Sequence, residues 1–453
     1  MSTLTQRPEQ RELFGHPIGL YILFFTEMWE RFSYYGMRAI LTLYLVGLTT
    51  DKNPGLGWSN MEALKLYGWY TMLVYVMSIP GGLIADKVLG QKKAVLYGGL
   101  ILIGGHSILA VQTMWAFYTG LALIILGVGM LKPNISTMVG GLYQQGDVRR
   151  DKGFTIFYIG INVGAFLSSL IVGYVGEVIG WHYGFGLAGI GMALGMGLYA
   201  YGQKYLVHVG NFIGANSATK EEKEALNKPL TAIEWDRIKV LMLSFLIVIV
   251  FWGAFEQAGG LMNIYTKVKT NRMLMGFEVP ASWFQSLNAF FIIVLGTTIA
   301  GFWAKRKLGG KQSSSLFKMA IGVIIMGSGF LFMTAATAQF NTQGSSAMYW
   351  LVLAYLFHTV GELCASPVAL SFITKLAPLK YGSLMMGIYF AMTGFGNKLA
   401  GWLGESASNL GEYTIFTGIA VFCMIFGLLI LAILKPLNRL THGAEDDEHV
   451  IVE

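Results

Sequence analysis

The feature that most constrains this chain is an apolar stretch, long enough to cross a bilayer, that recurs along its whole length. A transmembrane helix needs roughly 20 apolar residues to cross a hydrocarbon core of about 30 Å. Only 13% of the residues are charged, against roughly 25% in ordinary soluble proteins, so a water-soluble fold is excluded. We therefore predict an all-α integral membrane protein with 12 transmembrane helices. The expected spans are 18–46, 61–84, 94–111, 115–138, 153–176, 184–206, 238–257, 283–304, 316–337, 347–374, 383–404 and 413–434.

The longest polar segment divides these spans into two groups of six. It contains the run ATKEEKEALNKPLTAIEWDR, which is typical of a short amphipathic or solvated helix. The segment is too short and too polar for an additional helix pair between the halves. We predict an N-terminal six-helix bundle over 1–206, a cytoplasmic linker over 207–237, a C-terminal bundle over 238–436 and an acidic cytoplasmic tail over 437–453.

An internal repeat supports this division into two halves. Residues 82–92 read GLIADKVLGQK and residues 301–311 read GFWAKRKLGGK, and both follow the second span of their half. Gly, Ala, Leu, Gly and Lys recur at one constant spacing. The first copy resembles the loop signature of the major facilitator superfamily, in which two bundles rock around a central site.

The distribution of Lys and Arg predicts the orientation of the chain. If the N-terminus is cytoplasmic, most of the 32 basic residues lie on the inner side, as the positive-inside rule requires. We therefore expect a multi-pass protein of the plasma membrane, the inner membrane in a bacterium, with both termini in the cytoplasm. The basic residues expected outside are Lys52, Lys65, Lys267, Lys269 and Arg272.

The first span carries several charges on one helix face. At about 100° per residue, five polar side chains fall within roughly one stripe. Charges at the bilayer centre are costly, so this face is expected to line a polar interior. The alternative is a set of ion pairs that hold helices together, which the i,i+4 spacing of Glu27 and Arg31 would allow. The five residues are Glu27, Glu30, Arg31, Tyr34 and Arg38.

Further polar residues lie inside later spans. Lys132 precedes Pro133, where the helical hydrogen bonds are interrupted, and Glu362 shares a face with His358 and Ser366. Other interpretations stay open for several of them: helix packing for Asn162 and His358, an interfacial position for Glu256, and snorkelling to the outer surface for Lys398.

The buried charges are distributed unevenly between the halves. The N-terminal half holds Arg31, Arg38 and Lys132, whereas the C-terminal half offers Glu256 and Glu362. A basic wall and an acidic wall suit a zwitterion, because paired cations bind a carboxylate well. We expect Arg38 and Lys132 to bind a carboxylate and Glu362 to bind an ammonium group.

Two motifs resemble signatures of the proton-dependent oligopeptide transporter (POT/PTR) family of the major facilitator superfamily. Residues 27–36 read EMWERFSYYG, similar to its first-helix signature, and residues 157–164 read FYIGINVG, similar to its second. The resemblance continues through GVGMLKPNIS, FWGAFEQ, WFQSLN and GELCASPVALSFITKLAP. It implies a symporter that imports di- and tripeptides with protons by alternating access.

The resemblance also implies roles for individual residues. Tyr389 stands where relatives often have tryptophan, which leaves the side-chain preference open. The residues implied to bind substrate are Tyr34, Arg38, Tyr75, Lys132, Asn162, Asn288, Glu362, Ser366 and Tyr389, and those implied to couple protons are Glu27, Glu30, Arg31 and Glu256.

Other functions remain as alternatives. A related carrier could transport another anionic or zwitterionic solute, such as nitrate, a drug or an amino-acid conjugate. An enzyme is not expected, since no nucleophile constellation is visible, and seven scattered His residues argue against a metal site. We expect a monomer in contact with membrane lipids, with protons as the coupling ion, no other cofactor and no nucleic-acid partner.

Overall fold

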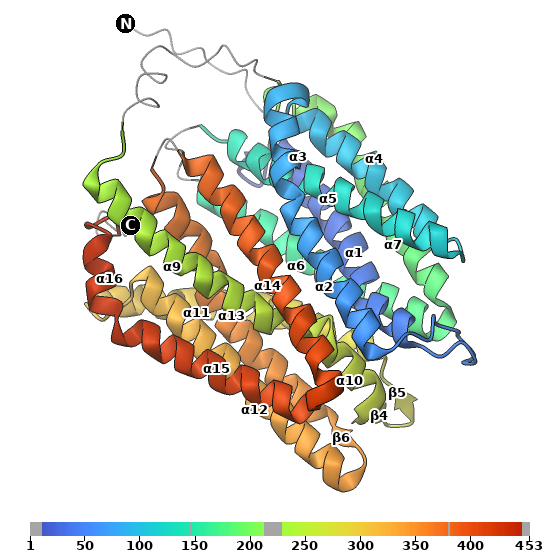
Figure 1. The fold of residues 1–453 in the computed structure, drawn as a ribbon. Helices are drawn as coiled ribbons and strands as arrows, with labels where there is room; N and C mark the ends of the chain where they lie inside the picture. Colours follow the sequence, from blue (N-terminus) through green and yellow to red (C-terminus); the bar gives the residue numbers. More distant parts are fainter. Residues whose placement is uncertain (1–10, 145–146, 148, 213–228, 379–380, 446–453) are drawn as a thin grey trace, which may run out of the picture. The chain divides into compact units, whose positions relative to one another are not determined.

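The computed structural model describes residues 11–144, 147, 149–212, 229–378 and 381–445. Regular structure in these residues is almost entirely helical (Figure 1). Their strands are two residues long and form three two-stranded sheets. The predicted all-α class is therefore confirmed.

The chain forms two compact units. Unit 1 comprises residues 1–40 and 76–217, and unit 2 comprises 41–75 and 218–453. The boundaries fall within α1 (Ile18–Val46) and at the end of α2 (Asn60–Val76). The remaining elements of unit 1 are β1 (Glu12–Leu13), β2 (His16–Pro17), α3 (Ser78–Ile84), the π-helical turn η1 (Ala85–Leu89), α4 (Gln91–Leu109), α5 (Met114–Gly141), α6 (Arg150–Tyr174), the π-helical turn η2 (Val175–Ile179), α7 (Trp181–Gly202) and the 3₁₀ helix η3 (Gln203–Tyr205).

Unit 2 is the larger unit. Its helices are α9 (Ala232–Phe255), α10 (Leu261–Lys269), α11 (Ser286–Leu308), α12 (Ser315–Gln343), α13 (Met348–Leu376), α14 (Gly382–Leu410), α15 (Glu412–Ala432) and α16 (Leu434–Leu440), with 3₁₀ helices η4 (Glu256–Ala258) and η5 (Ala281–Gln285). Its strands are β3 (Thr270–Asn271), β4 (Met273–Leu274), β5 (Phe277–Glu278) and β6 (Ser346–Ala347).

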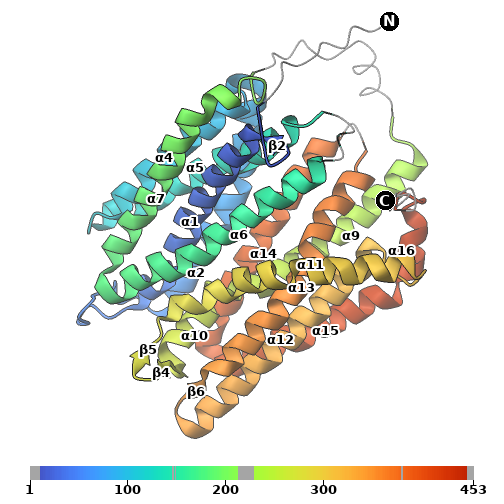
Figure 2. The same ribbon diagram turned by 180° about the vertical axis from the view of Figure 1, so that it is seen from behind.

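Each unit is built from helices packed along one another. In unit 1, α4 packs against α5 and α7 (Figure 1). In unit 2, α12 packs against α13 and α15 (Figure 2), and α14 packs against α9 (Figure 1). Fully buried aromatic rings, among them Phe330, Phe372 and Phe416, fill the core of unit 2.

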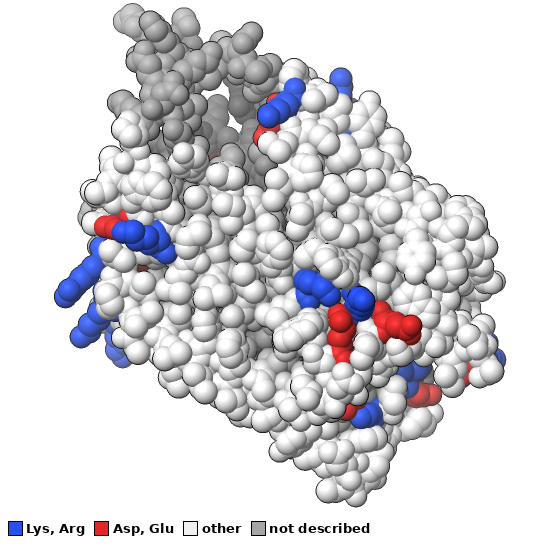
Figure 3. Space-filling model, viewed as in Figure 1, with Lys and Arg blue, Asp and Glu red and all other residues white. Residues whose placement is uncertain are grey.

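Nine helical stretches among the described residues are long and apolar enough to cross a membrane. The other three predicted spans correspond to α1, α4 and α14, which are also helices. Helix α1 occupies the predicted range 18–46 and is not among these nine because it carries the predicted charges. On the face shown in Figure 3, charged side chains lie in a few separate groups, as expected for a surface in contact with lipid.

Helix α9 begins inside the predicted linker. The Thr231 side chain accepts a hydrogen bond from the backbone of Glu234, whose carboxylate accepts one in return. This capping box starts the helix before its apolar part. Residues 213–228 of the predicted linker and 446–453 of the predicted tail lie outside the described residues, and the domain boundaries stay a prediction.

Candidate functional site

Helix α1 buries a compact group of two acids and one base in unit 1. Glu27, Glu30 and Arg31 are at most 2% exposed. Nε of Arg31 lies 3.2 Å from Oε1 of Glu27 and also donates to Oε2 of Glu30. Oε2 of Glu27 and Oε1 of Glu30 are buried and accept no hydrogen bond from any described residue. Each carboxylate therefore contacts Arg31 through one oxygen and has a second oxygen at which a proton can be held.

Aromatic rings of α1 and a lysine of α5 lie close to these charged residues. The guanidinium of Arg31 lies 5.4 Å from the ring centroid of Tyr34, and that of Arg38 lies 4.8 Å from that of Tyr35, distances at which cation–π attraction operates. Lys132 on α5 interacts electrostatically with Glu27 and with Glu30. The structure thus brings Arg31 and Lys132 together with Glu27 and Glu30, and it places Arg38 beside Tyr35.

The second sequence motif lies on α6, next to this charged segment of α1. A Cβ atom at Gly164 would lie 2.2 Å from the carbonyl oxygen of Met28 and 3.1 Å from Cβ of Arg31. Only glycine permits this approach of the two helices. Asn162 is buried, and its Nδ2 donates to the Tyr158 carbonyl of its own helix at 2.9 Å.

In unit 2, α11 and α13 bring together two predicted substrate residues. Nδ2 of Asn288 donates to Oε2 of Glu362 at 2.7 Å and to Oγ1 of Thr359 at 3.1 Å. Glu362 is 8% exposed. The amide orients the carboxylate, which stays an acceptor for a further donor such as an ammonium group.

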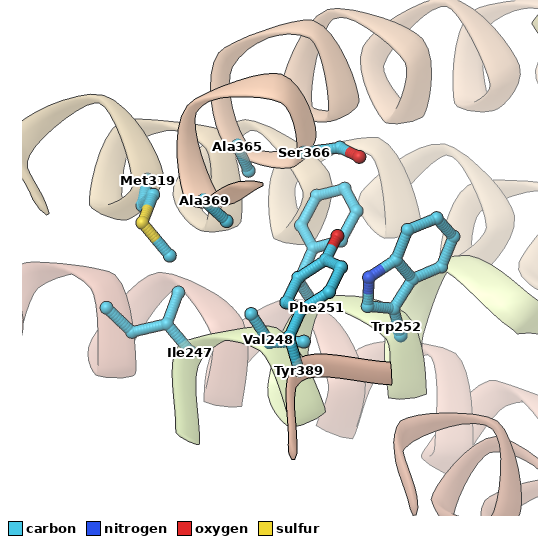
Figure 4. Close-up of a pocket in the computed structure, with 9 residues that line it drawn as sticks. All are labelled: Ile247, Val248, Phe251, Trp252, Met319, Ala365, Ser366, Ala369 and Tyr389. Carbon is cyan, nitrogen blue, oxygen red and sulfur yellow. The ribbon is translucent and has the colours of Figure 1, made fainter. Parts of the chain in front are cut away.

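Two other predicted substrate residues, Ser366 on α13 and Tyr389 on α14, border a small pocket of unit 2 (Figure 4). Its volume is about 10 Å³, room for about one water molecule. Its other walls are mostly apolar and include Phe251 and Trp252. Tyr389 also interacts electrostatically with Tyr75 and Glu362, so these predicted residues form one neighbourhood.

Glu256 has a partner, Tyr67, that the sequence does not reveal. It is 3% exposed at the start of η4, and its Oε1 accepts a 2.5 Å hydrogen bond from the phenol of Tyr67 on α2. The neighbouring residue Gly68 packs against α14, since a Cβ atom there would lie 2.9 Å from Cα of Gly401. Tyr67 sits in a predicted span among other tyrosines, and no sequence signal distinguishes it from them.

The structure shows the surroundings of His358 and Lys398, for which the sequence leaves packing and snorkelling open. His358 is buried, its ring centroid lies 4.4 Å from that of Phe330, and its ring nitrogens make no hydrogen bond to described residues. Lys398 forms an ion pair with Glu405 at 3.1 Å and lies over the ring of Trp69. A packing role fits His358, and an ion pair anchors Lys398.

Buried charges inside an all-helical membrane protein mark a pathway for a substrate or an ion. The model of the POT family matches residues 92–221 and 234–414, and the chain belongs to this family. The peptide transporter YePEPT of Yersinia enterocolitica is 33% identical over 99% of this chain and 100% of its own. A di-/tripeptide transporter of Lactococcus lactis is 34% identical over 95% of this chain and 98% of its own.

Solved structures show the same fold. The crystal structure of peptide transporter POT in complex with sulfate is 35% identical and has a TM-score of 0.87, covering 95% of this chain and 97% of its own. A POT family transporter in complex with 5-aminolevulinic acid is 30% identical and has a TM-score of 0.86, covering 94% and 98%. These matches confirm the predicted major facilitator fold and the resemblance found in the sequence.

Proposed function

We propose that this protein is a proton-coupled symporter that imports di- and tripeptides across the plasma membrane by alternating access. The observation that carries the proposal is the buried group of Glu27, Glu30 and Arg31, with Lys132 in electrostatic range. Ionisable groups inside a membrane protein mark substrate or proton pathways. Membership of a family whose relatives include named peptide transporters supports peptides as the substrate.

The ends of the peptide determine how it binds in this proposal. Arg38 and Lys132 in unit 1 bind the peptide carboxylate, and Glu362 in unit 2 binds the terminal ammonium group. Asn288 supports Glu362 through its 2.7 Å hydrogen bond. The remaining substrate contacts come from Tyr34, Tyr75, Asn162, Ser366 and Tyr389.

Protons bind to the buried acids. Glu27 and Glu30 share Arg31, so movement of that guanidinium changes the electrostatic environment of both carboxylates. Glu256 acts in unit 2, where Tyr67 donates to it. Protons are the coupling ion, and the transport cycle uses no other cofactor. We further propose that both termini are cytoplasmic and that the protein functions as a monomer surrounded by lipid.

One solved relative points to a second candidate substrate class. That POT family transporter was crystallised with 5-aminolevulinic acid, which carries an amine and a carboxylate but no peptide bond. The paired cations and the acid described above would also suit such a zwitterion.

A counterflow experiment distinguishes the two candidate substrate classes, peptides and small zwitterions without a peptide bond. Liposomes that contain the purified protein are loaded with unlabelled dialanine, and uptake of labelled dialanine is measured against competitors outside. Dialanine and trialanine should compete strongly, and alanine and nitrate should not. Stronger competition by 5-aminolevulinic acid than by any peptide would favour the second class.

A further inference from the structure

A cavity of about 350 Å³ opens at the end of unit 1 where α1 begins and α7 ends. Two of the residues that line it, Arg11 and Lys204, carry a positive charge, and a third is His208. The remaining walls include the apolar side chains of Ile18 and Val207 and the ring of Tyr205. The cavity therefore combines positive charge with an apolar lining, and it shares no residue with the proposed transport site.

The first wall of the cavity is a firmly anchored hairpin. Strands β1 and β2 pair antiparallel, and the Ile18 amide donates to the Arg11 carbonyl at 2.9 Å. Nη1 of Arg149 donates to Oε1 of Glu12 at 2.7 Å, and Nδ1 of His16 lies 2.8 Å from the Tyr143 hydroxyl. These contacts hold the backbone of Arg11 beside the start of α1.

The second wall is the turn that follows α7. The Leu206 amide donates to the Gln203 carbonyl at 3.1 Å, and the Leu206 side chain is fully buried. Nζ of Lys204 lies 4.3 Å from the ring centroid of Tyr201 and 5.2 Å from that of Tyr205. The ammonium group is thus placed by two aromatic rings rather than by a carboxylate.

The positive charge of this cavity is not neutralised within the described part of the chain. Arg11, Lys204 and His208 form no ion pair with any described Asp or Glu, whereas Glu12 beside the cavity is engaged with Arg149. Basic side chains that converge without an acid favour an anionic ligand. A phosphate group, like a carboxylate, is an anion that Arg and Lys donors bind well.

We propose that this cavity binds the phosphate headgroup of an anionic phospholipid. Phosphate chemistry alone would also suit inorganic phosphate, but two observations favour the lipid. The cavity lies at the end of membrane-spanning helices, where headgroups lie, and Tyr201 is 71% exposed there, as interfacial tyrosines are. The apolar side chains of Ile18 and Val207 supply contacts for a glycerol and acyl portion. Basic pockets at the ends of transmembrane helices bind headgroups in this way.

The test is calorimetric titration of the purified full-length protein in neutral detergent. The probes are short-chain phosphatidylglycerol, short-chain phosphatidylcholine and inorganic phosphate. We expect phosphatidylglycerol to bind at least about tenfold more tightly than either of the others. Equal binding of phosphatidylcholine would overturn the proposal, and tighter binding of inorganic phosphate would replace the lipid by the free anion.

Two triple variants, each replacing three basic side chains by glutamine, locate the site. Arg11→Gln/Lys204→Gln/His208→Gln should weaken phosphatidylglycerol binding about tenfold or more. The control is Lys305→Gln/Lys311→Gln/Lys435→Gln, which alters three exposed basic residues of unit 2 and should change binding less than about twofold. Equal effects of the two triple variants would contradict a specific site. Dipeptide counterflow tests whether the first triple variant is folded. If that variant is not folded, the single variant Lys204→Gln takes its place.

Discussion

The phenol of Tyr67 donates a 2.5 Å hydrogen bond to Oε1 of Glu256, and both side chains are at most 3% exposed. The bond joins α2 to η4 within unit 2. A hydrogen bond to an ionised acceptor is roughly twice as strong as a neutral one. If Glu256 takes up a proton, as proposed above, this contact weakens, and the packing of α2 would then be coupled to proton binding.

Tyr67→Phe should destabilise the protein by about 1–3 kcal/mol, because the buried carboxylate loses the hydrogen bond from this phenol. Melting temperatures in detergent, measured for Tyr67→Phe, Glu256→Gln and the double variant, form a double-mutant cycle. The double variant should be less destabilised than the sum of the two single variants. Strict additivity would show that the two side chains do not interact energetically.

Glu30→Gln should abolish uphill accumulation of dialanine while preserving counterflow. The glutamine amide resembles a permanently protonated carboxyl of nearly unchanged volume, so the site can bind and exchange peptide without releasing a proton. Asp51→Asn is the control, since this exposed acid forms no ion pair with any described residue and should leave both activities unchanged. Full accumulation by Glu30→Gln would make Glu30 a structural residue and place proton coupling elsewhere.

Glu362→Gln should weaken the binding of free dipeptides by about 2–5 kcal/mol, the usual loss when one partner of a desolvated charged contact is removed. N-acetylated dipeptides carry no ammonium group, so their binding affinity should fall much less. Competition against labelled dialanine in counterflow measures both affinities. Equal losses for the two ligands would assign Glu362 a structural or gating role.

Lys132→Ala removes a cation that is proposed to bind the carboxylate end of the peptide. This variant should weaken the binding of free dipeptides more than the binding of C-terminally amidated dipeptides, because an amidated peptide has no carboxylate for Lys132 to bind. The same competition assay reports the difference. An equal loss for free and amidated peptides would remove Lys132 from the carboxylate site.

Gly164→Ala should destabilise the protein by about 1–3 kcal/mol or more, because the added Cβ meets the Met28 carbonyl at 2.2 Å and cannot be accommodated without a helix shift. Gly197→Ala on α7 is the control, since a Cβ there meets nothing within 4 Å. It should leave the melting temperature unchanged or raise it, as alanine favours helix more than glycine does. A Gly164→Ala protein as stable as the control would contradict the close α1–α6 contact.

Much of the fold could be predicted because membrane helices are long and apolar. Helix α1 occupies its predicted range because polar residues on both sides mark the ends of one long, mostly apolar stretch. The start of α9 at Ala232 was harder to predict, because the capping box of Thr231 and Glu234 extends the helix beyond its apolar part. The π-helical turns at Ala85–Leu89 and Val175–Ile179 depend on packing at the helix ends and leave no periodic signal.

In the candidate site, too, some groupings could be predicted from the sequence and others could not. Glu27, Glu30 and Arg31 share a helix face, so helical periodicity alone could group them. The contact of Asn288 with Glu362 and that of Tyr67 with Glu256 join residues far apart in the chain. One sequence contains no information on such pairings beyond the polarity of each residue.

The central claim, proton-driven peptide transport, is tested most directly by dialanine accumulation in liposomes that contain the purified protein. A neutral zwitterionic peptide carried with one proton moves one positive charge inward, so an inside-negative potential adds about 2.3 kcal/mol of drive per 100 mV. We predict that an inwardly directed proton gradient drives the internal dialanine concentration above the external one, and that the potential raises it further. Internal dialanine that never exceeds the external concentration, whatever gradient is imposed, would contradict the account.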